Sequence, residues 1–294
     1  MTDLTLVTVH GFVSSPRTWE RLVAVWSADE RLRSLRIHPF EYRSPKMPRL
    51  PLSPQRIPDY DDIAQTLAST FTAALADAPA TAFVTHSQGG LIVQRFLAWM
   101  LQQGRGRELS RIVSVIMLAC PNNGSDYVRT LRHAFGYRRH PQAGDLEMLN
   151  RRVADTQRTV LRDIVNTDRT DDHRCRIPFH VYAGDSDRIV VAASAQSAFP
   201  GASTLAGNHA SILDPSAPGN TTADVVRYHL LADHSSWRTA SPSSGRAVPQ
   251  DSRGPGIVEG LMTSNGDITV SGTYVAGHDI RFDRHADDEQ ERSS

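Results

Sequence analysis

The sequence contains little cysteine and little lysine, and it has no long apolar run. Its 294 residues include two cysteines, Cys120 and Cys175, which are too few for a framework of disulfide bonds. No apolar run is long enough to span a bilayer. Lys46 is the single lysine among 32 basic residues, a bias that we attribute to genomic composition.

The sequence also has no excess of positive or negative charge. The formal net charge is +0 at pH 7, because 32 basic residues balance 32 acidic residues. A balanced chain has no broad positive field with which to attract a polyanion, so nucleic acid is a poor candidate partner. The opening stretch, M-T-D-L-T-L-V-T-V-H, has no basic leader and no long apolar core. We therefore expect no signal peptide and a cytoplasmic protein.

Short β-prone runs alternate with helical patterns up to about residue 232. The runs expected to form strands are 4–9, 35–42, 80–84, 111–119, 177–183 and 202–206. The segments expected to form helices are 18–33, 59–76, 91–101 and 222–231. The Pro-rich stretch 44–58 is expected to be a loop. This alternation predicts the α/β fold class, with a mostly parallel sheet flanked by helices and functional residues at the ends of the strands.

Residues 120–175 interrupt the alternation. They contain Arg-rich helical patterns near 126–135 and 145–165. An insertion after the strand at 111–119 would lie over the carboxyl edge of the sheet, so we expect a helical cap. The alternative is a solvated helical decoration with no role at the site.

The segment Thr85-His86-Ser87-Gln88-Gly89 joins an expected strand to an expected helix almost without a loop. A serine hydroxyl becomes a nucleophile when a base takes its proton and nearby donors receive the developing negative charge. A sharp strand-to-helix turn exposes such a serine, and it needs small neighbours. The segment resembles the nucleophile elbow of α/β-hydrolases, with Thr85 in place of the first glycine. That replacement predicts a tighter turn.

The resemblance extends to the loop after the first strand. His10-Gly11-Phe12 resembles the oxyanion loop of these enzymes. By that likeness, the backbone N–H groups of Phe12 and Gln88 would form the oxyanion hole. His10, Gly11, His86 and Gly89 would support the site rather than react.

Two further loops complete the likeness. Y-A-G-D-S-D-R-I-V-V at 182–191 resembles the acid loop, and G-N-H at 207–209 resembles the histidine loop. His209 would be the general base, and the resemblance favours Asp187 as its acid partner, with Asp185 bracing the turn. Asp185 remains the alternative acid. The order of serine, aspartate and histidine along the chain agrees with the family.

The substrate class follows from two stretches and from position 87. H-G-F-V-S-S-P-R-T-W at 10–19 and P-N-N-G-S-D at 121–126 look like those of lipases and acyl-deacylases. This resemblance implies a carboxylic ester of an acyl chain, phospholipids included. Epoxide hydrolases and haloalkane dehalogenases would require an aspartate where Ser87 stands. We expect no cofactor and no metal, because the twelve histidines show no paired ligand spacing.

The composition changes after residue 232. Residues 233–255 are rich in Ser, Pro, Gly and Arg, which predicts a flexible linker, and residues 285–294 form a polar tail. Residues 256–284 are β-prone, and their run N-G-D-I-T-V-S-G-T-Y-V-A-G-H-D-I resembles bacterial amyloid signalling motifs. The positions expected to assemble are Ile268, Val270, Gly272, Tyr274, Val275, Gly277, Asp279 and Ile280. The alternative is a hairpin that turns at Asn265-Gly266 and docks on the hydrolase as an edge.

The motif implies partners as well as a fold. In proteins that carry such motifs, a matching copy on an NLR-like receptor templates assembly of the effector. The sequence therefore predicts a serine lipase or esterase that self-assembles as a bacterial cell-death effector and contacts membranes when activated. A housekeeping esterase or thioesterase with an incidental tail is one alternative. A non-catalytic interaction protein on a hydrolase fold is the other.

Overall fold

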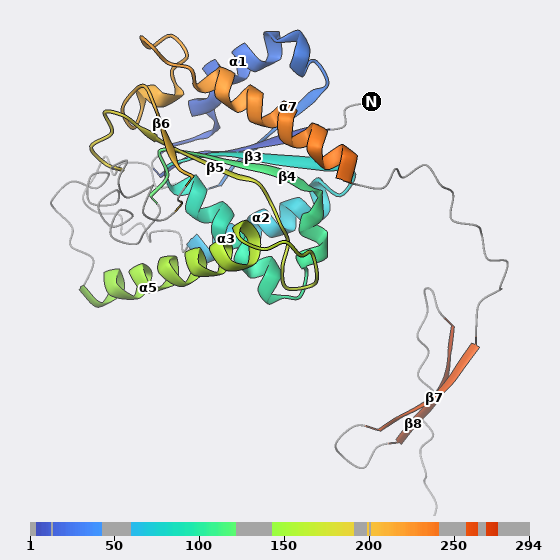
Figure 1. Cartoon of the computed structure of the whole chain (residues 1–294). Coiled ribbons are helices and arrows are strands. Elements are labelled where there is room, and N and C mark those ends of the chain that lie inside the picture. The colour runs from blue at the N-terminus through green and yellow to red at the C-terminus, as the bar shows by residue number, and fades with distance from the viewer. Residues whose placement is uncertain are drawn as a thin grey trace, which may run out of the picture. The chain divides into compact units, whose positions relative to one another are not determined.

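A computed structural model describes residues 4–12, 14–42, 60–121, 143–190, 199, 201–240, 257–263 and 269–275. For residues 60, 143–150, 257–263 and 269–275 the description covers the backbone. The chain divides into two compact units, Met1–Pro242 and Ser243–Ser294, and each is described by itself (Figure 1).

The first unit contains a parallel six-stranded sheet in the order β2-β1-β3-β4-β5-β6. Its strands are β1 (Leu4–Val9), β2 (Leu35–Phe40), β3 (Ala80–His86), β4 (Ile112–Leu118), β5 (Phe179–Gly184) and β6 (Ser203–Leu205). Every residue of β1, β3 and β4 is buried, because helices cover both faces of a parallel sheet. The expected α/β class and all six expected strands are confirmed.

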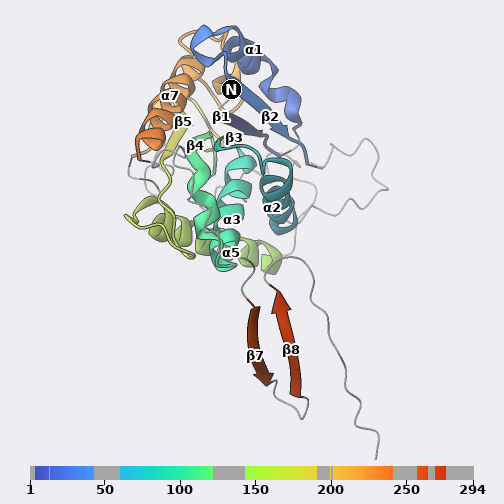
Figure 2. The ribbon, with the colours of Figure 1, turned by 90° about the vertical axis from the view of Figure 1, so that its right-hand side faces the viewer.

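Helices form a layer on each face of the sheet (Figures 1 and 2). One layer holds α1 (Glu20–Ala28) and α7 (Thr222–Ala240), and the other holds α2 (Tyr60–Ser69) and α3 (Gln88–Gln102). The helix α5 (Ala143–Val160) packs against α3. The short helical turns are η1 (Pro16–Trp19), η2 (Glu30–Leu32), η3 (Thr70–Ala74), η4 (Gly106–Arg111), η5 (Leu161–Val165) and η6 (Ser211–Leu213).

Each layer has its own apolar core. On the α2–α3 side, the rings of Phe71, Phe83 and Phe96 pack together with centroids 5.3 to 6.4 Å apart. On the α1–α7 side, Trp19 and Trp26 are 1% exposed. Burial of these large side chains on both faces fixes the sheet, and it fixes the strand ends that carry the site.

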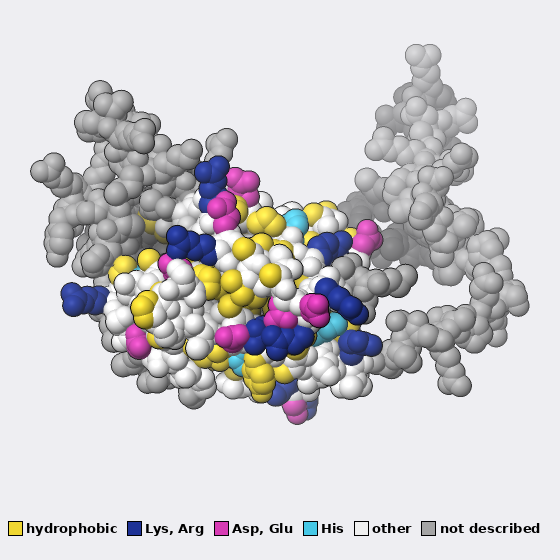
Figure 3. Space-filling model, turned by 90° about the horizontal axis from the view of Figure 1, so that it is seen from above, with side chains coloured by type: hydrophobic (Ala, Val, Ile, Leu, Met, Phe, Trp, Pro, Cys, Tyr) yellow, Lys and Arg dark blue, Asp and Glu magenta, His cyan; other side chains and the backbone are white. Residues whose placement is uncertain are grey.

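Charges on the α1–α7 face are interspersed rather than segregated (Figure 3). Arg21 pairs with Asp214 at 2.6 Å, and Arg227 pairs with Asp224 at 2.6 Å. The large apolar side chain most exposed among the described residues is Tyr228 of α7, at 67%. Basic and acidic side chains lie side by side on this view, so its described part presents no field of a single sign.

The end of the first unit differs from the sequence-based boundary. The linker was expected to begin at residue 233, but α7 continues to Ala240. Asp233 accepts a hydrogen bond from Ser114 Oγ at 2.6 Å, and Trp237 Nε1 donates to the carbonyl oxygen of Ser110 at 2.8 Å. These contacts with β4 and with the end of η4 hold the last two turns of α7 on the sheet layer. The prediction of a linker over 233–240 is therefore wrong.

The expected cap is described in part. The helix expected over 145–165 is confirmed as α5 followed by η5, and Arg152 Nη1 of α5 lies 3.2 Å from Asp61 Oδ2 of α2. This part packs on the α2–α3 layer. The helix expected near 126–135 and the whole of the Pro-rich stretch at 44–58 lie outside the described residues.

The second unit contains one antiparallel strand pair. β7 (Ile257–Thr263) pairs with β8 (Thr269–Val275), with Gly260 opposite Gly272. This pairing agrees with the hairpin alternative, although its turn at Asn265-Gly266 lies outside the described residues. Val270, Gly272, Tyr274 and Val275 lie in β8, whereas Ile268, Gly277, Asp279 and Ile280 lie outside the described residues. Amyloid assembly stays a prediction.

None of the helices in the described part of the chain combines the length and the apolar character needed to cross a bilayer.

Candidate active site

Ser87 occupies a one-residue turn between β3 and α3. Its backbone angles are φ 53° and ψ −126°, a left-handed conformation that costs a residue with a Cβ about 1–3 kcal/mol. The turn is held because Ser87 N donates to the carbonyl oxygen of Leu118 at 3.1 Å, and Gly90 N donates to that of Ser87 at 3.1 Å. The strain is the local cost of turning the serine side chain toward His209 at the carboxyl end of a buried strand.

The glycines around Ser87 are required by close packing. A Cβ on Gly89 would collide with the carbonyl oxygen of Val9 and would lie 2.8 Å from that of His10. A Cβ on Gly11 would lie 2.8 Å from the Cβ of Ser87. The loop after β1 therefore passes directly beside the serine.

Position 85, where the related pattern has glycine, accommodates threonine. Thr85 is fully buried at the end of β3, and its Oγ1 lies 3.3 Å from the Sγ of Cys120 and 3.4 Å from the carbonyl oxygen of Ile116. The threonine methyl and hydroxyl thus fill space under the turn without blocking Ser87. Burial raises the pKa of the Cys120 thiol to about 12, so this cysteine stays neutral.

His209 connects Ser87 to a carboxylate. Its Nε2 lies 3.1 Å from Ser87 Oγ, and its Nδ1 lies 2.9 Å from Asp187 Oδ2. The Asp187 side chain is completely buried, whereas that of His209 is 19% exposed. Three side chains from three separate loops thus form one hydrogen-bonded chain, with the serine at one end and the carboxylate at the other.

The two candidate aspartates have different environments. Asp187 Oδ1 accepts backbone hydrogen bonds from Ile189 at 2.7 Å and Val190 at 3.0 Å. Burial acts to raise the pKa of Asp187, but the hydrogen bond with His209 and these backbone donors outweigh it and lower the pKa below the ordinary value. Asp185 Oδ1 instead accepts from Gly207 N at 3.0 Å. Asp187 therefore faces the imidazole, and Asp185 ties the acid loop to the histidine loop.

Two further histidines, both neutral, lie beside the hydrogen-bonded chain of Ser87, His209 and Asp187. Burial and the nearby His209 lower the pKa of His86 to about 3, and burial lowers the pKa of His10. His86 Nε2 lies 2.8 Å from the carbonyl oxygen of His209. His10 Nδ1 lies 2.9 Å from the carbonyl oxygen of Gly11. Both rings therefore hold loop backbone near Ser87.

Tyr42 was missed by sequence analysis. Its ring stacks on that of His10 at 4.1 Å, and its hydroxyl donates to the carbonyl oxygens of His10 at 2.7 Å and Gly11 at 3.2 Å. Its place just after β2, the strand beside β1, could have indicated this contact. The tyrosine braces the loop that contains Phe12.

Phe12 and Gln88 are the residues that the sequence predicts to supply the oxyanion donors, and this stays a prediction. Gln88 is the first residue of α3, and the N–H groups of a first helical turn have no partner within the helix. Phe12 directly follows Gly11, which touches Ser87. Both residues therefore adjoin the turn that carries Ser87.

Comparison with known proteins agrees with this geometry. A model of the alpha/beta hydrolase family matches residues 6–247, so the chain belongs to that family. No curated protein sequence matches the chain.

Solved structures of thioesterases are similar to it. The human thioesterase 2 is 10% identical, with 82% of this chain and 99% of that chain covered and a TM-score of 0.44. The type II thioesterase BorB from the borrelidin biosynthetic cluster is 16% identical, with 78% and 93% covered and a TM-score of 0.46. The RedJ thioesterase of Streptomyces coelicolor is 16% identical, with 79% and 86% covered and a TM-score of 0.43.

Proposed function

We propose that this protein is a serine hydrolase that cleaves carboxylic esters through an acyl-enzyme. The observation that carries the proposal is the continuous hydrogen-bonded chain from Ser87 through His209 to Asp187. A serine in a strained turn, a histidine with one nitrogen on the hydroxyl, and a buried carboxylate on the other nitrogen are the parts that acyl transfer requires.

In the first half of the reaction, His209 Nε2 takes the proton of Ser87 Oγ as the oxygen attacks the ester carbonyl. Negative charge develops on the carbonyl oxygen, where the N–H groups of Phe12 and Gln88 would receive it. The tetrahedral intermediate collapses as protonated His209 gives its proton to the leaving alcohol. The acyl group then remains on Ser87.

In the second half, water replaces the alcohol. His209 takes a proton from the water as it attacks the acyl-serine, and returns that proton to Ser87 Oγ when the acid leaves. Asp187 keeps His209 in the tautomer with its proton on Nδ1 and stabilises the imidazolium that forms twice per cycle. The low pKa of Asp187 keeps it charged throughout.

The proposed substrate is an ester of an acyl chain, with phospholipids as the favoured source and thioesters as the alternative. Support comes from the lipase-like stretches at 10–19 and 121–126. Wild type and Ser87→Ala would be compared on p-nitrophenyl esters of increasing chain length, on an acyl thioester and on vesicles of bacterial phospholipid. We expect serine-dependent release that rises with acyl length. Equal turnover by Ser87→Ala would contradict the proposal.

We also propose that the second unit drives self-assembly, with an NLR-like receptor carrying a matching motif as its partner. The supporting observation is the pairing of β7 with β8, since a lone two-stranded pair is marginally stable in water and has two open edges. Full-length chain and a chain ending at residue 242 would be followed by thioflavin T fluorescence and electron microscopy. We expect fibres from the full-length chain and none from the truncated chain. Two equally monomeric chains at high concentration would contradict assembly.

A further inference from the structure

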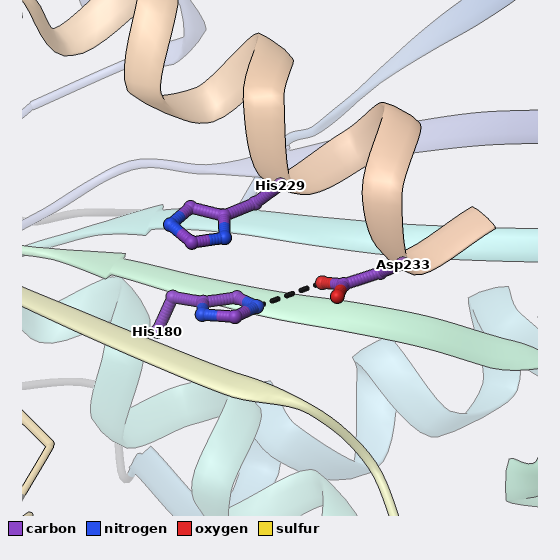
Figure 4. A group of neighbouring side chains, drawn as sticks. All are labelled: His180, His229 and Asp233. Atoms are coloured by element: carbon purple, nitrogen blue, oxygen red, sulfur yellow. Dashed lines mark hydrogen bonds and ion pairs between the residues drawn. The ribbon is translucent and has the colours of Figure 1, made fainter. Parts of the chain in front are cut away.

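A second polar cluster lies between β5 and α7 (Figure 4). It contains His180 of β5 with His229 and Asp233 of α7, and one ligand atom from each lies within 4.8 Å of the others. His180 Nε2 lies 2.7 Å from Asp233 Oδ2, and the two imidazole rings stack at 3.6 Å. Figure 4 shows the rings and the carboxylate gathered at one place.

Hydrogen bonds within and around the cluster orient its three side chains. The Tyr182 hydroxyl lies 2.7 Å from His229 Nε2, so Nδ1 is the nitrogen of His229 that can face an ion. The Ser114 hydroxyl donates to Asp233 Oδ2 at 2.6 Å and orients that carboxylate. Histidine ligands of metals commonly use their second nitrogen in such a hydrogen bond, which fixes the tautomer and the ring.

The cluster is separate from the hydrolytic residues. His180 is the second residue of β5, opposite Ile116 of β4, whereas Ser87 and Asp187 follow the carboxyl ends of their strands. The His180 and Asp233 side chains are 22% and 15% exposed. An ion can therefore reach these side chains from solvent. Their hydrogen bonds to neighbouring groups fix their positions.

We propose that His180, His229 and Asp233 form a binding site for a divalent transition metal ion, with zinc as the reference ion. Two imidazole nitrogens and a carboxylate are a donor set that Zn²⁺ favours, and a water molecule would complete four-coordination. Zinc bonds of about 2.0–2.2 Å place tetrahedral ligand atoms about 3.3 Å apart. For the three ligand atoms to converge on one ion, the stacked rings must rotate out of their parallel arrangement and the bond between His180 Nε2 and Asp233 Oδ2 must open.

His229 would bind an ion as a neutral ring. The neutral ring can offer Nδ1 to an ion while its Nε2 donates a proton to the oxygen of Tyr182. The ion would join a strand of the sheet to the last helix of the first unit, so binding should stabilise that packing.

The test uses the full chain after treatment with a chelator, titrated with Zn²⁺ by calorimetry and with Co²⁺ by visible absorption. We expect one ion per cluster, a Co²⁺ spectrum of mixed nitrogen and oxygen coordination, and a Tm raised by about 5 °C or more at 100 times the Kd. Neither readout depends on hydrolysis, so the result stands apart from the proposed esterase activity.

Three variants assign the ion to the cluster. Asp233→Asn and His229→Gln should abolish the Co²⁺ spectrum, and Tyr182→Phe should weaken binding about 10-fold or more. His38→Gln removes a histidine of β2 outside the cluster and should bind as wild type does. No binding by wild type at millimolar zinc would overturn the proposal. Binding that survives both Asp233→Asn and His229→Gln would also overturn it.

Discussion

The ring of His86 lies 4.9 Å from that of His209, and its Nε2 lies 2.8 Å from the carbonyl oxygen of His209. His86 precedes Ser87 directly, so one residue links the serine turn to the histidine loop across 123 positions of sequence. With its pKa lowered to about 3, His86 is neutral at physiological pH and acts through position rather than proton transfer.

Replacing His86 by phenylalanine should therefore lower kcat and leave KM nearly unchanged. The ring shape remains, but the bond that places the His209 backbone is lost, and a small displacement of a catalytic group can cost about 10- to 100-fold. His86→Gln keeps a donor and should restore part of the rate. The pH profile of kcat should keep its shape in both variants. A shift of the pH profile of kcat would indicate that His86 takes a direct part in proton transfer.

The two aspartates of the acid loop give a matched pair of variants. Asp187→Asn should reduce kcat by about 10⁴-fold, because the amide favours the wrong tautomer of His209. Asp185→Asn keeps an oxygen that can accept a hydrogen bond from Gly207 N, so this variant should lose little of its kcat. Steady-state kinetics on one p-nitrophenyl ester would measure both. The reverse order of effects would show that Asp185 is the acid.

Of the glycines around the turn, Gly89 should tolerate a side chain least. Gly89→Ala would press a Cβ onto the backbone of Val9 and His10, and we expect a loss of about 3 kcal/mol in the free energy of unfolding. Gly201→Ala is the matched control, because a Cβ there meets no atom within 4 Å. Urea denaturation of the two variants would measure the difference. Equal stabilities would mean that the loop after β1 is not packed against α3 as described.

Acid should weaken the fold through the buried histidine beside the site. Below pH 6.5 the unfolded chain protonates His86, whereas the folded chain resists protonation down to about pH 3, so stability falls as pH falls through this window. Between pH 7 and 5 this group should cost about 2 kcal/mol, while Asp187, with its lowered pKa, remains ionised. His86→Gln should lose stability less steeply than wild type over that range. Identical slopes would contradict a buried, neutral His86.

The sequence placed the candidate catalytic residues after strands for a physical reason. Ser87, Asp187 and His209 each follow a short apolar run, and parallel strands bring their carboxyl ends to one edge of the sheet. The choice of Asp187 over Asp185 came from resemblance, and the hydrogen bond with His209 agrees with it.

Contacts between distant segments could not be read from the sequence in the same way. The end of α7 is polar, and its composition predicts a linker, but Trp237 and Asp233 bond to residues more than 100 positions away. His180 and His229 are 49 positions apart, and only the packing of β5 under α7 brings them together. The spacing of His229 and Asp233 by one helical turn was the available indication.

The central claim is that Ser87 is the nucleophile activated by His209. The most direct measurement is labelling of the folded chain with a fluorophosphonate, followed by mass spectrometry of the peptides. The account predicts one adduct on Ser87, none in Ser87→Ala, and much slower labelling in His209→Gln. An adduct on another residue, or labelling of Ser87 at an unchanged rate in His209→Gln, would contradict it.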